Sequence, residues 1–328
     1  MKASHIPIEP PASYHDLPFT QLQLSHHPPT SKTVTPIILL ELYRPKNNNA
    51  FTGTMMREVI EAYKIFELDD RVKVIVFTGY GKMFCAGADL AVGFSKDDES
   101  IGDRGEQDHR DGGGRVSLAI HNSTKPTIGA INGSAVGIGI TMTLPMVIRI
   151  ASQAAKIGFV FGRRGIVSEA GSAFFLPRLI GYSKALHLVS TGAVYPATHP
   201  LLDGLFSEVL PQEKVLPRAI ELAEEMASQV STVSIKLMRD MIWRGPQSGE
   251  EQHLLDSRIL YRLFGSKDNE EGVRSFMEKR PAKFEATMRQ DAPGVWPWWT
   301  PVNIGPDPDK EGRELARLKR MKEAKSKL

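Results

Sequence analysis

The sequence predicts an α/β fold, and the pattern of its first quarter gives the reason. Residues 37–42 and 72–78 are short, rich in β-branched side chains and bounded by turn residues, which is typical of buried strands. Between them, residues 54–69 place Met, Val, Ile, Tyr and Phe side chains at helical spacing. A strand, a helix and a second strand in this order form the repeating unit of α/β proteins.

The composition is that of a globular protein with a full core. The chain has 328 residues, of which 41% are hydrophobic and 24% are charged. These values exclude a chain that is mainly disordered, collagen-like or coiled coil. The 41 Lys and Arg residues against 38 Asp and Glu residues argue against a nucleic-acid binder. Residues 304–328 hold 8 of these cations and 5 of these anions, so the net charge of +3 belongs to the tail.

The single cysteine, Cys85, excludes an internal disulfide and a cysteine-based zinc site, and it indicates a reducing compartment. The N-terminus lacks the apolar segment of a signal peptide. Residues 127–148 carry no charge, but their polar side chains, four glycines and Pro145 predict a buried strand, turn and helix instead of a membrane span.

The other elements of the core follow in order. Residues 1–34 are rich in Pro, Ser and His, and we expect an extension and an edge strand there. Residues 92–115 are charged, Gly-rich and nearly free of large apolar side chains, which predicts a long mobile loop. The elements expected after it are the end of a helix at 117–122 and strands at 125–132, 147–152 and 156–161.

From Ser172 onward the pattern is helical, with a pair of helices broken at Gly181. Further amphipathic helix is predicted over residues 213–245, 248–264, 269–279 and, in the charged tail, 309–325. The Pro- and Trp-rich residues 292–309 cannot form regular structure. We divide the chain into an N-terminal extension (1–30), a core (31–210), a helical region (211–284) and a Pro- and Trp-rich segment with a basic tail (285–328).

Two glycine-containing turns, residues 84–90 and 132–139, each follow a strand-like segment. Small residues at such turns let the backbone approach a ligand closely, and a helix that follows directs free N–H groups at it. Two such turns facing each other can hold an oxyanion. Either turn alone is also compatible with a tight turn packed in the core.

Taken together, the two turns and their spacing resemble the crotonase superfamily, the enoyl-CoA hydratase/isomerase family. The matching segments are RPKNNNAF, VIVFTGYGKMFCAGADL, KPTIGAINGSAVGIGITM, GIVSEAGSAFFLPRLIG and GVRSFMEKRPAKF, which span roughly residues 30–284. The resemblance implies a crotonase (ClpP/crotonase-like) ββα spiral over 31–210 and trimerisation helices over 211–284. It also implies a homotrimer or hexamer and an acyl-CoA thioester as the substrate, with no separate cofactor.

The resemblance assigns binding roles by motif position. The oxyanion hole would be the backbone N–H groups of Ala88 and Ile138, and one such donor contributes ~3 kcal/mol to transition-state stabilisation. The residues assigned to CoA or substrate binding are Ala86, Ala88, Asp89, Leu90, Gly137 and Phe161. Because the oxyanion contacts are made by the backbone, Ile138 can serve if its side chain points away.

The acid/base residues depart from the hydratase pattern. The two glutamates that hold and activate water in hydratases of this family fall on Thr141 and Phe161, which cannot act as carboxylate bases. Glu169 remains, at the position where the resemblance to peroxisomal-type Δ3,Δ2-enoyl-CoA isomerases places the single catalytic glutamate. Some dehalogenases of the family have a nucleophilic aspartate there. Without the resemblance, Glu169 is also explained as an acid that stabilises a helix N-terminus.

One carboxylate suits a 1,3-proton shift in a 3-enoyl-CoA, with Glu169 removing a proton from C2 and returning it at C4. An apolar wall that includes Phe161 would exclude water and raise the Glu169 pKa. Two alternatives remain. One is an enoyl-CoA hydratase of fatty-acid oxidation or of a secondary-metabolite pathway, and the other is a non-catalytic RNA-binding or scaffold relative.

Other candidate residues have simpler explanations. We expect Cys85 to be a small packed residue and His109 and His121 to be solvated near the loop. Contact with CoA phosphates or an acidic acyl group and ion pairing between subunits are equally compatible with Arg163 and Arg164. Asp203 and Gly204 resemble the family's helix-capping turn, and contact of Lys283 with the nucleotide is the weaker interpretation of that residue. No spacing of His, Cys, Asp or Glu predicts a metal site.

The chain ends in Ser326-Lys327-Leu328, which matches a peroxisomal import signal that is read by a receptor. The expected location is therefore the peroxisome, and the expected partners are the acyl-CoA substrate, further copies of the chain and the import receptor. Neither nucleic acid nor a membrane is an expected partner.

Overall fold

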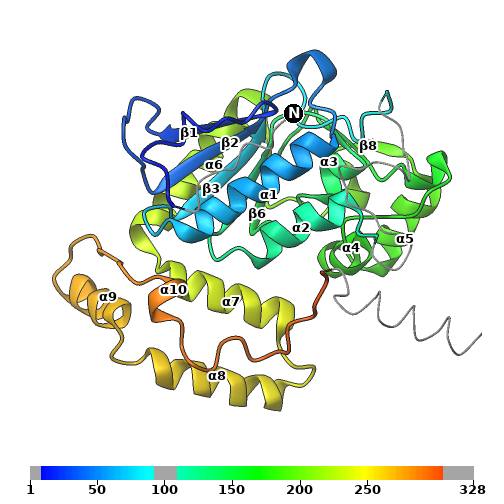
Figure 1. Cartoon of the computed structure of the whole chain (residues 1–328). Helices are drawn as coiled ribbons and strands as arrows, with labels where there is room; N and C mark the ends of the chain where they lie inside the picture. Colours follow the sequence, from blue (N-terminus) through cyan, green and yellow to red (C-terminus); the bar gives the residue numbers. More distant parts are fainter. Residues whose placement is uncertain (1–8, 92–108, 306–328) are drawn as a thin grey trace, which may run out of the picture.

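The computed structural model describes residues 9–91 and 109–305, and its core is built on two sheets (Figure 1). The larger sheet has the strand order β1-β2-β3-β4-β6-β9, in which only the β1–β2 pair is antiparallel. The smaller sheet has the order β5-β7-β8. The strands are β1 (Leu22–His27), β2 (Ile37–Leu42), β3 (Val74–Gly79), β4 (Thr127–Ile131), β5 (Ala135–Val136), β6 (Ile148–Ser152), β7 (Lys156–Gly158), β8 (Val194–Pro196) and β9 (Glu208–Leu210).

The helices are numbered in chain order. They are α1 (Gly53–Leu68), α2 (Gly112–Asn122), α3 (Ile138–Thr141), α4 (Ser172–Ile180), α5 (Tyr182–Thr191), α6 (Gln212–Gln229), α7 (Thr232–Arg244), α8 (Gly249–Leu263), α9 (Lys267–Met277) and α10 (Met288–Asp291). Three short 3-10 helices are η1 (Pro45–Asn47), η3 (Phe161–Arg164) and η4 (Pro200–Leu202). No helix within the described residues is long and apolar enough to cross a membrane.

Helices cover the large sheet on both faces, with α1 and α2 in front of it and α6 behind it in Figure 1. Side chains on a strand alternate between faces, so Val74 and Val76 of β3 pack with α6 while Ile75 and Phe77 pack with α1. Burial on both faces explains why the strand segments read as continuous apolar runs.

The C-terminal helices α7, α8 and α9 form a separate layer below the sheets (Figure 1). Their small core contains Val233 and Leu237 of α7 and Leu255 and Ile259 of α8. The irregular segment 292–305 packs on this core through Trp296 and Trp298. The absence of regular structure in residues 292–305 agrees with the prediction for the Pro- and Trp-rich segment.

The structure corrects two boundaries. Helix α2 begins at Gly112, inside the predicted loop 92–115, because the Asp111 side chain accepts a hydrogen bond from the Gly114 N–H and caps the helix. The predicted helix 213–245 is two helices, since the chain is extended at Val230 and Ser231 caps α7. Residues 92–108, the helix predicted at 309–325 and the C-terminal tripeptide lie outside the described residues.

Candidate active site

The two glycine-containing turns lie side by side. The Cys85 N–H donates to the Ser134 carbonyl at 3.2 Å, and the Val136 N–H donates to the Cys85 carbonyl at 3.1 Å. A Cβ atom on Gly139 would lie 2.4 Å from the Cys85 oxygen, so only glycine fits at this approach. Cys85 is buried, and its burial raises the thiol pKa to about 12, which confirms a packing role for this residue.

The geometry leaves the Ala88 and Ile138 N–H groups free to bind a ligand. The Phe51 N–H donates to the Gly87 carbonyl, and the Phe51 carbonyl accepts from the Asp89 N–H. These two bonds pair Phe51 with the residues on either side of Ala88, so the Ala88 N–H itself points away from Phe51. The Ile138 N–H lies at the start of α3, after Gly137 at a φ of +56°. Neither N–H has an acceptor among the described residues. Two free donors on adjacent turns are what an oxyanion hole requires.

Glu169 lies next to this pair of turns. The Thr141 hydroxyl donates to Glu169 Oε1 at 2.6 Å, and Thr141 belongs to the same short helix as Ile138. A Cβ atom on Gly113 would lie 1.6 Å from Glu169 Oε2 and 2.6 Å from Ile138 Cδ1. The carboxylate therefore occupies the space between the start of α2 and α3, near the Ile138 side chain.

A second carboxylate, Asp111, holds this arrangement together. Its Oδ1 accepts hydrogen bonds from the Gly114 N–H at 2.6 Å and from the Ala170 N–H at 3.1 Å. Ala170 has a φ of +60°, which is unusual for a residue with a side chain, and the bond to Asp111 supports this conformation. Asp111 thus connects the start of α2 to the residue after Glu169.

The surroundings of Glu169 adjust its acidity. Burial raises the Glu169 pKa to about 8, the hydrogen bond from Thr141 opposes this rise, and the Asp111 charge adds to it. A base with a pKa near the working pH takes and returns a proton most efficiently. Asp111 was not among the predicted site residues, although an Asp directly before a helical pattern is a recognised N-cap signal.

The residues predicted to bind CoA or substrate surround the same turns. Ala86 and Ala88 are half-buried and Leu90 is exposed. Asp89 forms an ion pair with Arg44 at 2.9 Å, and this contact lowers the Asp89 pKa. The Asp89 side chain is therefore engaged within the protein and not free for a ligand.

Phe161 is buried, and its ring lies 4.0 Å from where a Cβ atom of Gly137 would be. It therefore lies behind the turn that carries Ile138, where an apolar wall was predicted.

The prediction for His121 is wrong, because this residue is buried on α2 against Phe175, with ring centroids 5.2 Å apart. Burial and the neighbouring arginines lower its pKa to about 3.

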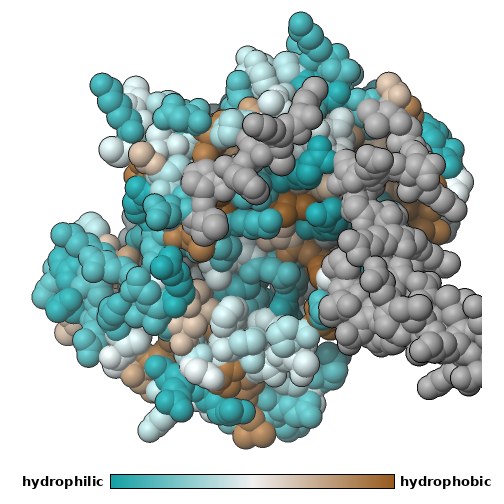
Figure 2. All heavy atoms as spheres, in the orientation of Figure 1, coloured by the Kyte–Doolittle hydropathy of each residue, from teal (hydrophilic) through white to brown (hydrophobic). Residues whose placement is uncertain are grey.

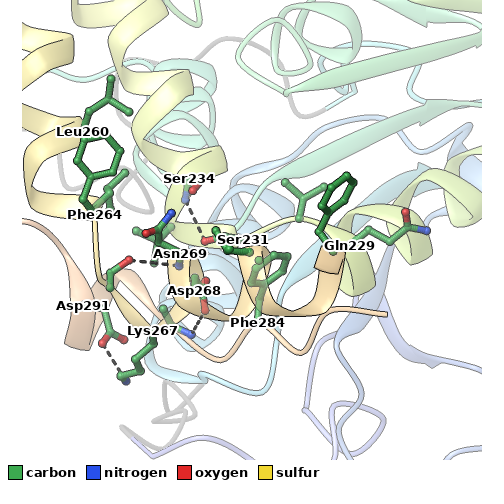
Figure 3. Close-up of a pocket in the computed structure, with 18 of the residues that line it drawn as sticks. Gln229, Ser231, Ser234, Leu260, Phe264, Lys267, Asp268, Asn269, Phe284 and Asp291 are labelled. Carbon is green, nitrogen blue, oxygen red and sulfur yellow. Dashed lines mark hydrogen bonds and ion pairs between the residues drawn. The ribbon is translucent and has the colours of Figure 1, made fainter. Parts of the chain in front are cut away.

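A cavity of about 620 Å³ lies elsewhere, between α7, α8 and α9 (Figure 3). Leu260 and Phe264 border it on one side and Phe284 on another, with the Lys267–Asp291 ion pair at its edge. None of the residues predicted for catalysis lines it. Among residues 9–91 and 109–305, no cluster of His, Cys, Asp and Glu is arranged to hold a metal ion.

Comparison with known proteins identifies the family. A family model described as enoyl-CoA hydratase/isomerase matches residues 32–287. The enoyl-CoA hydratase AFT3-1 of Alternaria alternata is 52% identical over 257 residues, which cover 78% of this chain and 85% of that protein. The 1,2-epoxyphenylacetyl-CoA isomerase of Escherichia coli (strain K12) is 31% identical over 256 residues, covering 76% and 94%.

Solved structures agree with this result. The crystal structure of an enoyl-CoA hydratase from Bacillus anthracis has a TM-score of 0.71 and 26% identity, and the match covers 81% of this chain and 99% of that one. The crotonase fold predicted from the two turns is thereby confirmed. The chain belongs to the enoyl-CoA hydratase/isomerase family of the crotonase superfamily.

Proposed function

We propose that this enzyme is an enoyl-CoA isomerase that converts a 3-enoyl-CoA into a 2-enoyl-CoA. The observation that carries the proposal is the position of Glu169, a buried carboxylate with a raised pKa that is hydrogen-bonded to Thr141 on the short helix that begins at Ile138. The two positions that would supply the hydratase glutamates hold Thr141, which donates a hydrogen bond to Glu169, and Phe161, which is buried.

The proposed reaction moves one proton between two carbons. Glu169 takes a proton from C2, the C2–H bond electrons form a double bond between C1 and C2, and the electrons of the C=O bond move onto the thioester oxygen, which gives a dienolate. The N–H groups of Ala88 and Ile138 stabilise that charge. Protonated Glu169 then donates its proton to C4, whose new C–H bond uses the electrons of the C3–C4 double bond, while the C1–C2 double-bond electrons form the C2–C3 double bond and the thioester carbonyl is restored. These steps transfer protons only, so the proposal needs no cofactor beyond the CoA thioester itself.

Hydration of a 2-enoyl-CoA is the second candidate. Asp111 supplies a second carboxylate next to Glu169, and such a pair can hold and activate a water molecule. The relative AFT3-1 is named a hydratase. Against this candidate, Asp111 Oδ1 already accepts two backbone hydrogen bonds, which suits a positioning role better.

Two variants separate the candidates. Glu169→Gln keeps an acceptor for Thr141, and Asp111→Asn keeps an oxygen for the Gly114 and Ala170 N–H groups, so both should fold. Each protein is assayed with 3-enoyl-CoA and 2-enoyl-CoA esters side by side. An isomerase loses nearly all activity in Glu169→Gln only, while Asp111→Asn remains active with its pH profile moved to lower pH. Rapid hydration by the wild type, lost in both variants, would establish the hydratase instead.

We also propose that the enzyme works in the peroxisome, in fatty-acid or related acyl-CoA metabolism, as a homotrimer or hexamer. The location rests on Ser326-Lys327-Leu328 as a signal for the import receptor. A fluorescent fusion at the N-terminus should enter peroxisomes, and removal of the three residues should leave it in the cytosol. Cytosolic fluorescence with the tripeptide present would contradict the proposed location.

A further inference from the structure

The segment after α10 lies beyond the family match and makes specific contacts with the rest of the chain. The match ends at residue 287, whereas the described chain continues to residue 305. In Figure 1 this orange-to-red segment leaves α10, passes α7 and α8, and rises toward α2 and α4. Two of its tryptophans bind α7: Trp296 Nε1 donates to Asp240 Oδ2 at 2.8 Å, and Trp298 Nε1 donates to the Arg244 carbonyl at 3.0 Å.

Arg244 joins this segment to the C-terminal end of α2. Its guanidinium lies over the Trp299 ring, 4.2 Å from the ring centroid. The same guanidinium donates to His121 Nε2 at 3.3 Å and to Asn122 Oδ1 at 2.6 Å. A planar guanidinium can stack on a ring and donate hydrogen bonds from its edge at the same time. The tryptophans are therefore held beside the last residues of α2.

The other end of the segment meets the residue before the α2 cap. Arg110 Nε donates to the Ile304 carbonyl at 2.8 Å, and Arg110 Nη2 donates to the Gly305 carbonyl at 3.5 Å. The Gly305 N–H donates to Asn303 Oδ1 at 2.9 Å, and this bond shapes the turn that presents the two carbonyls. The segment thus contacts both ends of α2.

The lengths of the two elements leave little slack between these contacts. Helix α2 has 11 residues, so it is about 16 Å long at a rise of 1.5 Å per residue. The chain from Trp299 to Ile304 spans about 17 Å when it is extended. The position of the tryptophans therefore limits where the Ile304 carbonyl, and with it Arg110, can lie.

The contacts of Arg110 lead on to the catalytic carboxylate. Arg110 precedes Asp111, whose Oδ1 accepts from the Ala170 N–H at 3.1 Å, and Ala170 follows Glu169. The helix that Asp111 caps begins with three glycines, residues 112–114. Glycine is a poor helix former, so this first turn holds Asp111 only weakly by itself. An anchor outside the helix supplies what the glycines lack.

We propose that residues 296–305 form a strap that positions Glu169 for proton transfer, with Arg110 as the positioning residue through which the strap acts. This inference rests on the proposed role of Glu169 as the base. The strap holds Arg110, Arg110 places Asp111, and Asp111 fixes the backbone at Ala170. A displacement of about 1 Å at a reacting group can lower a rate about 100-fold, so an anchor outside the site can control the reaction.

Two full-length variants release the strap at different points. Arg110→Ala removes the hydrogen bonds to its end, and insertion of two glycines after Thr300 keeps every anchor but adds about 7 Å of slack. A misplaced base slows proton transfer more than binding, so kcat should fall about tenfold in each, with KM changed less than about twofold. The midpoint of the pH–rate profile should move to lower pH, because a displaced Asp111 adds less to the rise in the Glu169 pKa. Arg110→Lys keeps one donor and should recover part of kcat.

A double variant and a matched control separate the strap from a general loss of stability. If the strap acts through Arg110, the glycine insertion should lower kcat no further in the Arg110→Ala background. Arg289→Ala is the control, since Arg289 also donates to a distant backbone carbonyl, that of Leu68 at 3.1 Å. It should keep the wild-type kcat and pH profile. Wild-type kinetics in the insertion variant, or additive losses in the double variant, would overturn the inference.

Amide hydrogen exchange tests the same contacts without a substrate. Exchange at the Gly114 and Ala170 N–H groups should be about tenfold faster in both strap variants, because their bonds to Asp111 open more often, and unchanged in Arg289→Ala. Equal exchange in wild type and strap variants would overturn the inference. The kinetics use whichever enoyl-CoA ester the wild type converts, so a failure of the isomerase proposal is seen in the wild type and a failure of this inference in the variants.

Discussion

At the scale of single residues, the site depends on how Thr141 and Asp111 act on Glu169. Thr141 donates to the carboxylate and favours its charged form, whereas burial and the Asp111 charge favour the neutral form. The balance leaves the Glu169 pKa at about 8. Activity that requires the carboxylate as a base should therefore rise with pH through about 8.

Replacement of Thr141 by Val removes the one contact that lowers this pKa while keeping the shape of the side chain. We expect the midpoint of the pH–rate profile to move upward by about one pH unit, because a hydrogen bond to a charged group contributes about 1.5–3 kcal/mol. The rate at pH 7 should fall about tenfold, and the rate at high pH should be retained. Steady-state kinetics from pH 6 to 10 give the profile, and an unmoved midpoint would contradict this account of Thr141.

Glu169 also makes stability depend on pH. Its pKa is raised above its ordinary value of 4.5, so the folded protein holds this proton more tightly than the unfolded chain does. The resulting stabilisation is complete below pH 4.5 and is lost as the pH rises through about 8. Glu169→Gln cannot ionise, so this variant should exceed the wild type in free energy of unfolding at pH 9 more than at pH 5. Urea denaturation at both values tests the sign, and an equal difference at both would refute it.

The residues of the site were not equally predictable. Ala88 and Ile138 follow from short motifs, because their backbone roles depend on local turns, and Glu169 follows from its place in the motif GIVSEAG. Asp111 could not be assigned this way, since its contact with Ala170 joins positions 59 residues apart. His121 belongs to the buried face of α2, and the polar, Gly-rich composition of the residues just before this helix hides that position in the sequence.

At the scale of elements, helix α2 is fixed at both ends. Asp111 caps its N-terminus, and Arg239 and Lys236 of α7 donate to the carbonyls of residues at its C-terminus. Cations are favourable there because the helix dipole places negative charge at that end. The segment 292–305 supports both ends of α2. Trp296 donates a hydrogen bond to Asp240, near the C-terminal end of the helix, and the Ile304 carbonyl accepts one from Arg110, next to the N-terminal cap.

The buried pair Lys236–Asp240, 2.9 Å apart, is the most sensitive part of this support. Burial and the Arg239 charge lower the Lys236 pKa to about 8, and the Asp240 charge and hydrogen bond oppose this fall. Asp240→Asn leaves a buried cation without its partner and should destabilise the protein by about 3–5 kcal/mol. Urea denaturation measures the loss. The double variant Lys236→Met, Asp240→Asn should recover part of it, and a single-variant loss below about 1 kcal/mol would argue against a structural role for the pair.

At the scale of the whole molecule, the sequence predicted the long elements and missed the short ones. Strands β2, β3, β4 and β6 were expected near their observed positions because burial on both faces produces clear apolar runs. The strands β5, β8 and β9 have two or three residues each, which is too short for any periodic pattern. These short strands form because they pair with strands that are distant in the sequence, and such pairing leaves no signal in the local sequence.

The apolar surface of the C-terminal helices concerns the assembly of the molecule. Ile242 of α7, Tyr261 of α8 and Phe276 of α9 are all largely exposed, and Figure 2 shows apolar atoms along the lower edge over α8. These helices also border the cavity of Figure 3. A monomer rarely exposes so many large apolar side chains in one region, so we expect further copies of the chain to cover them.

A charge placed on this surface should prevent that assembly. Phe276 is 81% exposed within the single chain, so Phe276→Asp costs little in the folded monomer but buries an unpaired carboxylate in the oligomer. Analytical ultracentrifugation should show a trimer or hexamer for the wild type and a smaller species for the variant, with unchanged circular dichroism. Val302→Asp is the matched control, since Val302 is 82% exposed but lies outside the C-terminal helices, and it should leave the assembly intact. A monomeric wild type, or equal dissociation in both variants, would show that these helices do not join the copies.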